Sequence, residues 1–298
     1  MNRALILSDG RMGHLNQSYA LVKHLNIPYD VVSVKFKYKG YKLLSYIFDK
    51  IGFYTQALFR AKIDKTIHYH IVIGTGSTVY YATKVIAKEL DAKSVVMMLP
   101  KGYRYDFDII FAQTHDTPPK QENIFEIPVN LSYGEPKGVY QPIKKSIGII
   151  IGGENPFFIN SKEKIQSQLE SIKKLHKEYE IAITTSPRTT KEMEQLVESF
   201  HFNYEVIFSK NPINPIADFL EQCEVVYITA DSTSMISEAL CMGKANIVVL
   251  PLAYKKQSKF THFVEQLAQQ GYLHIFDESI QKRDKKIEIK SYLEGLPL

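Results

Sequence analysis

The sequence predicts an α/β protein with two doubly wound, Rossmann-like domains. Short β-branched strands alternate with helical patterns through both halves of the chain, which is typical of βαβ units around a parallel sheet. The alternation stops once, in a Gly-, Pro- and polar-rich stretch at residues 129–145 that has the character of a linker. A chain of 298 residues is long enough for two domains. We therefore expect an N-terminal domain over residues 1–143 and a C-terminal domain over residues 144–298.

In the first domain, the expected strands are short apolar runs with helices between them. A buried strand at residues 3–9 is followed by a helix at 16–25. A second strand at 29–36 leads into a long aromatic and basic helix that ends near residue 61. Further strands are expected at 70–74, 94–99, 108–113 and 124–128, with a helix at 77–90.

In the second domain, the alternation restarts with a strand at residues 146–151. Asn160 and Glu163 have the spacing of a capping box for the next helix, and Thr189 with Glu192 marks another helix start. The other expected strands are at 180–186, 204–209, 224–229 and 246–250, and the other expected helices at 214–223 and 232–242.

Composition excludes several classes of protein. With 45% hydrophobic and 23% charged residues, 15 glycines and 13 prolines, the chain is neither disordered nor collagen-like. No apolar run reaches the roughly 18–20 residues of a spanning helix, and the apolar stretch in residues 1–9 is too short for a signal peptide. Two cysteines cannot form a disulfide framework. We therefore expect a cytoplasmic protein.

The net charge of +5 is concentrated in the first domain, where 18 Lys and Arg residues stand against 12 Asp and Glu residues. Residues 35–65 hold seven lysines and one arginine against two acids, interleaved with eight aromatic residues. Basic side chains beside Phe and Tyr suit an anionic membrane interface, so the segment predicts peripheral contact with the inner face of a membrane. The alternative is a core-packed helix with a solvated basic face. No nucleic-acid module accompanies the segment, and no nucleic-acid partner is expected.

A first candidate site follows the strand at residues 3–9, because ligands bind beyond the carboxyl ends of strands in open parallel sheets. Asp9 and His14 are the two groups there that are best suited to abstract a proton at neutral pH. The other polar or flexible residues of this loop are Gly10, Arg11, Gly13, Asn16 and Gln17. The alternative is an ordinary turn in which Asp9 is a local cap and His14 a surface residue.

Two loops of the second domain could hold a phosphate or a sugar. The strand at 146–151 is followed by paired glycines and an acid, Gly152, Gly153 and Glu154. Glycines let a ligand approach the backbone closely. The strand at 180–186 runs into two hydroxyls and a fork-shaped cation, Thr185, Ser186 and Arg188, which could hold a diphosphate. The alternatives are a plain strand–helix turn and hydroxyl capping beside a solvated arginine.

A further loop carries the strongest signal. Asp231 is followed by three hydroxyl residues at a helix N-terminus, Ser232, Thr233 and Ser234, where side chains and helix dipole together favour an anion. Glu238 lies on the same helical face as Ser234, and its carboxylate could accept hydrogen bonds from both hydroxyls of a ribose. The alternative is a helix cap with a solvated Glu238.

A metal site is not expected. Asp106 and Asp108 have the Asp-x-Asp spacing of a metal signature, but they stand at the entry of an apolar strand rather than at its exit. The sequence contains no Walker A motif and no cysteine–histidine zinc cluster.

Five blocks of the chain resemble the mitochondrial fission (elongated-mitochondria type) family, whose bacterial members are described as glycosyltransferases of the GT-B fold. The blocks are SDGRMGHLNQS at 8–18, FDIIFAQTHDTP at 107–118, IGIIIGGENP at 147–156, TTSPRTT at 184–190 and NPIADFLEQCEVVYITADSTSMISEAL at 214–240. The chain departs from the pattern at Arg11-Met12, where the family often shows Lys-Pro, a difference that bears on the shape of this loop.

The resemblance implies two Rossmann-like domains that face a cleft, with a nucleotide-sugar donor on the second, an acceptor on the first and no metal. The leading hypothesis is an inverting glycosyltransferase that moves a sugar from this donor to an envelope glycan or a lipid-linked acceptor. The nucleotide sugar is then a substrate, and no cofactor is expected. The alternatives are a nucleotide-sugar epimerase or hydrolase, and a non-catalytic adaptor at a membrane.

Overall fold

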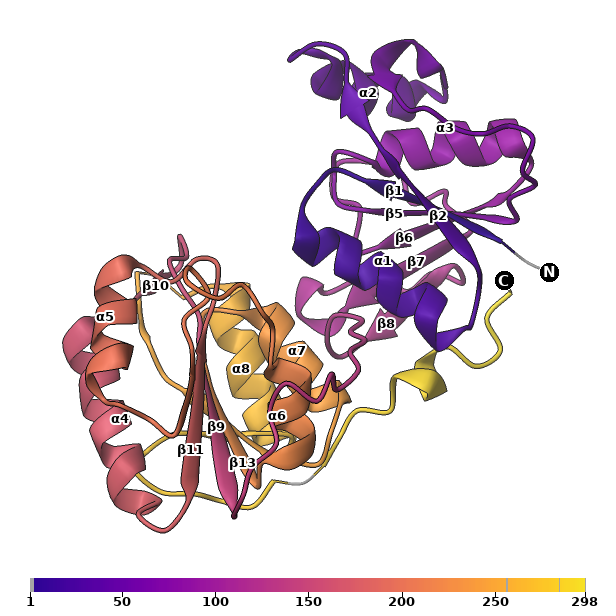
Figure 1. Cartoon of the computed structure of the whole chain (residues 1–298). Coiled ribbons are helices and arrows are strands. Elements are labelled where there is room, and N and C mark those ends of the chain that lie inside the picture. The colour runs from indigo at the N-terminus through magenta and orange to yellow at the C-terminus, as the bar shows by residue number, and fades with distance from the viewer. Residues whose placement is uncertain (1–2, 256, 284, 298) are drawn as a thin grey trace. The chain divides into compact units, whose positions relative to one another are not determined.

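The computed structural model describes residues 3–255, 257–283 and 285–297. It divides into two compact units. Unit 1 comprises the chain up to Tyr133 together with the segment from Glu288 onward, and unit 2 comprises Gly134–Ile287. Each unit has its own six-stranded parallel sheet (Figure 1), which confirms the prediction of two doubly wound α/β domains. In the described part of the chain, no helix is long and apolar enough to cross a membrane.

The sheet of unit 1 has the strand order β2–β1–β5–β6–β7–β8. In chain order the strands are β1 (Ala4–Ser8), β2 (Tyr29–Ser33), β5 (Ile71–Thr75), β6 (Lys93–Met97), β7 (Ile109–Gln113) and β8 (Ile124–Ile127). The inner strands are continuous buried apolar runs, as expected for a sheet covered on both faces. Helices α1 (Met12–His24) and α3 (Tyr80–Leu90) cover opposite faces (Figure 1). The winding direction therefore reverses between β1 and β5.

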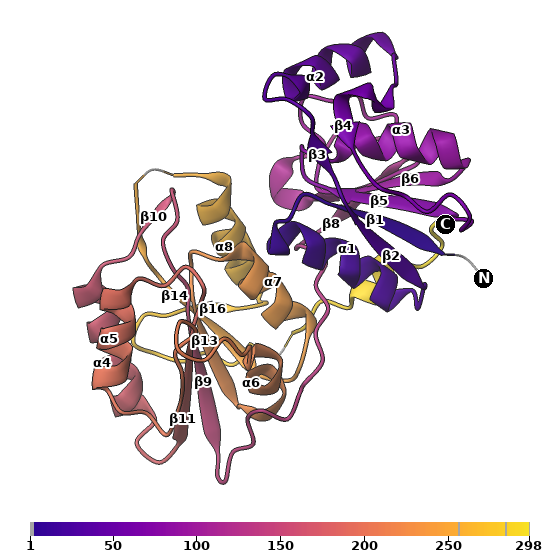
Figure 2. The ribbon, with the colours of Figure 1, turned by 45° about the horizontal axis from the view of Figure 1, so that its top comes forward.

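One part of unit 1 lies outside this sheet. Strands β3 (Lys35–Phe36) and β4 (Phe59–Arg60) pair antiparallel, and between them lie helix α2 (Tyr41–Ile51) and the short 3₁₀ helix η1 (Gln56–Leu58). Figure 2 shows α2 beyond this two-stranded ribbon. The prediction of one long helix to residue 61 is wrong: Gly52 takes the left-handed conformation, with φ 72°, that ends α2.

The sheet of unit 2 has the order β12–β11–β9–β13–β14–β16. Its strands are β9 (Ser146–Ile151), β11 (Glu180–Thr185), β12 (Tyr204–Val206), β13 (Val225–Thr229), β14 (Asn246–Leu250) and β16 (His274–Ile275). Figure 1 shows α4 (Lys162–Leu175) and α5 (Lys191–Ser199) on one face. On the other face are α6 (Ile216–Gln222), α7 (Thr233–Cys241) and α8 (Lys259–Gln269). The short strands β10 (Phe158–Ile159) and β15 (Ala253–Tyr254) pair antiparallel. The winding reverses between β9 and β13.

The two units divide the chain differently from the expected boundary at residues 143 and 144. The segment before β9 belongs to unit 2, because the N–H groups of Gly138 and Val139 donate to the Asp218 carboxylate, at 2.8 and 3.2 Å. The Tyr140 ring packs on Phe219 of the same unit. At the other end, the 3₁₀ helix η3 (Ile289–Tyr292) belongs to unit 1, where the Lys93 ammonium donates to the carbonyl of Pro297.

Candidate functional site

Unit 1 places the predicted acid–base pair at the point where the winding of its sheet reverses. Asp9 follows the last residue of β1, and His14 lies in the first turn of α1. Nδ1 of His14 is 3.1 Å from Oδ2 of Asp9, while the N–H of Arg11 donates to Oδ1 of Asp9 at 3.1 Å. The side chain of Asp9 is 3% exposed and that of His14 is 21% exposed. A carboxylate oxygen accepts hydrogen bonds, so Nδ1 is the donor in this pairing, and in the neutral imidazole the lone pair is then on Nε2.

The imidazole of His14 packs against the backbone of Gly76, a residue that the sequence did not single out. Gly76 follows β5, the strand beside β1, and has φ 94°. A Cβ on Gly76 would lie 2.4 Å from Nδ1 and Cε1 of His14, so only glycine leaves room for the ring. A Gly-rich turn after the neighbouring strand was a signal in the sequence, but the neighbour relation of β1 and β5 is set by long-range pairing.

The other residues of the first loop divide into turn, surface and core positions. Gly10 has φ 85° and donates its N–H to the Ser8 hydroxyl at 3.1 Å, so it makes the turn after β1. Gln17 is buried, and its side-chain oxygen lies 3.5 Å from the amide nitrogen of Gln113. The remaining candidates are exposed on the surface of unit 1: Arg11, Gly13 and Asn16.

In unit 2, the loops after β9 and β13 meet at the corresponding reversal point and are joined through Asp231. The Asp231 carboxylate accepts hydrogen bonds from the Gly153 N–H at 3.0 Å and the Thr229 hydroxyl at 2.6 Å. The N–H of Gly152 in turn donates to the Thr229 hydroxyl at 2.7 Å. Burial raises the pKa of Asp231, and these donors act against that shift. Gly152 and Gly153 thus use their own N–H groups to fix the loop.

Arg188 connects the loop after β11 to the same network. Its guanidinium is 3.3 Å from Oδ2 of Asp231 and donates to the Glu154 carbonyl at 3.1 Å. The Glu154 N–H donates to the Arg188 carbonyl at 3.1 Å, while the Glu154 side chain is exposed. Asn155 lies in the predicted loop but was given no role, and its amide donates to the Asp231 carbonyl at 2.9 Å. The guanidinium of Arg188 remains about half exposed, so it presents charge at the carboxyl edge of the sheet.

The predicted hydroxyls at residues 185 and 186 have internal partners. Oγ1 of Thr185 accepts the N–H of Phe208 at 2.8 Å. Oγ of Ser186 accepts the N–H of Arg188 at 3.2 Å and lies 3.1 Å from the Thr189 hydroxyl. Thr189 also donates to the Gly152 carbonyl at 2.6 Å. These hydroxyls hold the loops at the reversal point together.

Helix α7 begins at this edge with three consecutive hydroxyl residues. Ser232 is its N-cap and accepts the N–H of Met235 at 3.4 Å. Thr233 is half-buried and Ser234 is exposed. First-turn N–H groups have no acceptor within a helix, so those of Thr233 and Ser234 are available with their hydroxyls. Together with Arg188, this helix start can bind an anionic group.

Glu238 lies one turn further along α7 and is held apart from the Asp231 network. A Cβ on Gly134 would be 3.1 Å from Oε1 of Glu238, so the carboxyl group packs against the backbone of Gly134. No described residue donates a hydrogen bond to it, and burial raises its pKa to about 7. Such a carboxyl group has free hydrogen-bonding capacity for a ligand hydroxyl.

The two aspartates of the Asp-x-Asp pattern have structural partners in unit 1. Asp106 pairs with the ammonium of Lys84 and, at 2.7 Å, with the guanidinium of Arg104. Asp108 accepts the N–H of Ser94 at 2.7 Å and its hydroxyl at 2.6 Å. Among the described residues, no three His, Cys, Asp or Glu side chains gather as a metal site.

Unit 2 also has a pocket at the opposite edge of its sheet. It has a volume of about 770 Å³ and lies at the start of β9 and β13, with Ser146, Cys223 and Lys244 among its lining residues. Ligands of open parallel sheets bind at the carboxyl edge. This pocket lies at the amino ends of the strands, whereas the loops that carry Asp231 and Arg188 lie at their carboxyl ends, so the pocket is not part of the candidate site.

Comparison with known proteins agrees with this architecture. The chain matches the family described as mitochondrial fission ELM1 over residues 12–291. The uncharacterized protein RP120 of Rickettsia prowazekii is 24% identical over 92% of this chain and 90% of that protein. The glycosyltransferase SnogD from Streptomyces nogalater superposes with a TM-score of 0.53 at 10% identity, over 93% of this chain and 87% of SnogD.

A second solved structure shares the same fold. It comes from Listeria monocytogenes and is assigned as a UDP-N-acetylglucosamine 2-epimerase. It gives a TM-score of 0.51 at 12% identity, over 91% of this chain and 83% of that protein. At such identities the likeness establishes the fold alone. The chain belongs to the mitochondrial fission ELM1 family, and its fold is that of the GT-B glycosyltransferases.

Proposed function

We propose that the protein is an inverting, metal-independent glycosyltransferase that binds a nucleotide-sugar donor on unit 2 and an acceptor on unit 1. One observation carries the proposal. Both sheets have a constellation of polar groups at their reversal point, and the two constellations differ in chemistry. Unit 1 has the Asp9–His14 pair, and unit 2 has the anion-binding start of α7 beside Arg188. In open α/β sheets the reversal point is where ligands bind.

The donor diphosphate would lie at the start of α7. The N–H groups and hydroxyls of Thr233 and Ser234 would donate to phosphate oxygens, and Arg188 would supply a positive charge. As the bond between the anomeric carbon and the phosphate oxygen breaks, negative charge develops on the leaving diphosphate. Fixed donors aimed at that charge stabilise the transition state more than the ground state.

The ribose of the donor would bind to Glu238. Its carboxyl group lies on the face of α7 that also carries Ser234, about one helical turn away. With a pKa near 7 and no hydrogen-bond donor among the described residues, it can accept a hydroxyl hydrogen bond in its ionised form. Asp231 then has a positioning role, because its carboxylate is already occupied by Gly153 and Thr229.

His14 would act as the general base toward the acceptor. Its Nδ1–H is held by Asp9, so Nε2 takes the proton of an acceptor hydroxyl as that oxygen attacks the anomeric carbon. The single displacement inverts the anomeric configuration and needs no covalent enzyme intermediate. An envelope glycan or a lipid-linked sugar is the proposed acceptor, in accord with the excess of basic residues in the first half of the chain.

Calorimetry with nucleotide sugars tests the donor assignment. The Thr233→Ala, Ser234→Ala double variant is expected to bind the donor at least about tenfold more weakly, because hydrogen bonds to a charged group are lost. Ser199→Ala, which removes a hydroxyl from the far end of α5, is the matched control and should bind normally. Unchanged affinity in the double variant would place the diphosphate elsewhere.

Steady-state kinetics test the role of His14 as general base independently of donor binding. Asp9→Asn and His14→Ala are expected to lower kcat about 100- to 10,000-fold with donor affinity unchanged.

Rapid consumption of donor without any acceptor would favour an epimerase or hydrolase instead. Membrane recruitment without nucleotide binding would favour an adaptor.

A further inference from the structure

Helix α2 in unit 1 packs Tyr41, Tyr46 and Phe48 against the core but also exposes an apolar stripe to solvent. Its fully buried residues are the polar Ser45 and Asp49. Its apolar stripe at i, i+4 and i+8, formed by Leu43, Ile47 and Ile51, is 67, 49 and 71% exposed. Surface helices normally bury the apolar stripe and expose the polar one. The stripe therefore has the character of a docking surface.

A network of buried polar contacts fixes this orientation. The Asp49 carboxylate accepts the ammonium of Lys84 from α3 at 2.5 Å and the N–H of Arg104 at 2.7 Å. The Ser45 hydroxyl is 2.9 Å from the hydroxyl of Tyr103. Turning the apolar stripe inward would leave these buried polar groups without partners, which is costly. The stripe thus stays outward in the folded unit.

The apolar stripe is part of a larger surface. Tyr38, Leu44 and Phe53 flank it and are 64, 36 and 51% exposed. Figures 1 and 2 both show α2 at an extremity of unit 1, separated from the six-stranded sheet by α3 and the β3–β4 ribbon. Several large apolar side chains exposed within one short segment are typical of an interaction site.

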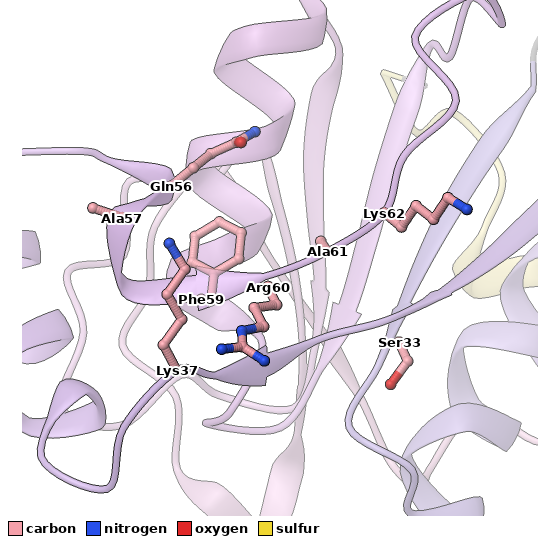
Figure 3. A pocket seen from close by; sticks show the side chains of 8 residues that line it. All are labelled: Ser33, Lys37, Gln56, Ala57, Phe59, Arg60, Ala61 and Lys62. Atoms are coloured by element: carbon pink, nitrogen blue, oxygen red, sulfur yellow. The ribbon is translucent and has the colours of Figure 1, made fainter.

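A basic pocket lies on the β3–β4 ribbon, whose two strands flank α2 in the chain. It has a volume of about 570 Å³ and a buried side chain, Phe59, among its lining residues. Its cations are Lys37, Arg60 and Lys62, and none of the three forms an ion pair with a described residue. Figure 3 shows Lys37 and Arg60 beside the Phe59 ring. Unpaired cations around a concave surface fit a phosphate group.

We propose that α2 and this pocket dock unit 1 on an anionic phospholipid bilayer. The stripe of Leu43, Ile47 and Ile51 inserts at the boundary of headgroups and acyl chains, and the pocket cations bind lipid phosphates. Charge complementarity selects this partner, because a bilayer of anionic lipids offers an apolar layer directly beneath a layer of phosphates. The inference goes beyond the proposed transfer reaction and does not depend on it, since none of these residues belongs to the donor or acid–base constellations.

Co-sedimentation with vesicles tests the proposal on the full chain. The wild-type protein is expected to bind vesicles of phosphatidylcholine with phosphatidylglycerol, to bind pure phosphatidylcholine much less, and to dissociate as salt is added. Lys37→Glu, Arg60→Glu and Lys62→Glu together should weaken partitioning at least about 100-fold, because each basic residue near an anionic surface contributes about fivefold.

A second set of variants tests the apolar stripe separately. Leu43→Gln, Ile47→Gln and Ile51→Gln keep helix-compatible side chains and should each weaken partitioning about tenfold. Ile143→Gln, Leu175→Gln and Ile280→Gln are matched controls on exposed apolar residues of unit 2, and Lys120→Glu, Lys174→Glu and Lys177→Glu are the charge controls. Controls should bind like wild type, and equal melting temperatures show that all variants are folded.

Several outcomes would overturn the proposal. One is equal binding of the wild type to neutral and anionic vesicles, or none to either. Another is loss of binding in the charge variant with no change in the stripe variant, which would make the contact purely electrostatic. Binding of inorganic phosphate in the pocket without vesicle binding would assign it to a free anion. Wild-type dimers that the stripe variant dissociates would assign the surface to a second copy of the chain.

Discussion

Gly152 and Gly153 lack side chains because the loops that meet in unit 2 leave no space for them. A Cβ on Gly152 would lie 2.2 Å from the carboxylate oxygens of Asp231. One on Gly153 would lie 2.1 Å from the carbonyl carbon and oxygen of Arg188, which are backbone atoms and cannot swing away. The two glycines thus set how closely the loops after β9, β11 and β13 approach.

Replacing Gly153 by alanine is expected to separate these loops. We expect Gly153→Ala to lower the free energy of unfolding by about 1–3 kcal/mol, as for other overpacked positions, and to weaken donor binding. Gly40→Ala is the control, because a Cβ there meets nothing within 4 Å. Chemical denaturation measures both, and equal stability of the two variants would contradict the assigned crowding.

Glu238 gives a prediction about pH. Burial raises its pKa from 4.5 to about 7, so the folded state holds this proton more tightly than the unfolded state. The resulting loss of stability is absent below about pH 4, grows between the two pKa values and is complete above about pH 7. At about pH 8, the free energy of unfolding of Glu238→Gln is therefore expected to exceed that of wild type by up to about 3 kcal/mol, which thermal denaturation detects as a higher melting temperature.

The difference between Glu238→Gln and wild type should shrink toward zero at about pH 4. Glu178→Gln, an exposed residue of the same unit, should follow the wild type at every pH. A Glu238→Gln variant that is less stable than wild type at about pH 8 would show that the carboxylate has a protein donor.

Among the elements, α2 shows how far one buried ion pair determines the orientation of a helix. Lys84 is 4% exposed and Asp49 is fully buried, and the Lys84 ammonium also lies 4.4 Å from the Phe107 ring centroid. Lys84→Met is expected to cost about 3–5 kcal/mol of stability, because it leaves the Asp49 charge buried without its main partner. Lys88→Met, one turn later and exposed, should change little. Urea denaturation distinguishes them, and a Lys84→Met variant as stable as the control would contradict this anchoring.

The sequence predicted the elements whose pattern is local. The strands at residues 146–151 and 246–250 were placed to the residue, because short runs rich in Ile and Val are typical of buried strands. It failed for residues 35–61, where one long helix was expected, because Gly52 ends α2 in the left-handed conformation and η1 and β4 follow it. Helix α8 was missed because its capping box uses Thr261 where Glu or Gln usually stands.

In the candidate site too, the sequence predicted the residues whose signal is local. Asp9, His14 and Asp231 could be selected because they lie in short polar stretches that follow apolar strands. Gly76 and Asn155 could not, because each acts on a residue brought near by strand order: Gly76 supports His14, and Asn155 binds the Asp231 carbonyl. Sequence position therefore located the loops but not the contacts between them.

At the scale of the whole molecule, the chain returns to unit 1 after completing unit 2. Ile289 and Leu293, on and just after η3, are buried in unit 1 at 3 and 6% exposure. Ile289→Ala with Leu293→Ala is expected to destabilise unit 1 by about 2–5 kcal/mol per side chain. Hydrogen exchange should then accelerate in β1, β5 and β6 and stay unchanged in β9 and β13. Uniform acceleration in both sheets would mean that the segment also stabilises unit 2.

The two units share one sheet architecture, and we propose that unit 2 binds the donor while unit 1 supplies the general base. Hydrogen exchange of the full chain, measured with saturating UDP, GDP, ADP and CMP sugars in turn, tests it most directly. One donor at about 100-fold its Kd should stabilise the protein by about 2.7 kcal/mol. It should protect the backbone at residues 152–154 and in the first turn of α7, while the loop at residues 9–14 stays unprotected until acceptor is added. Donor-dependent protection confined to residues 9–14, or no protection with any of these sugars, would contradict the account.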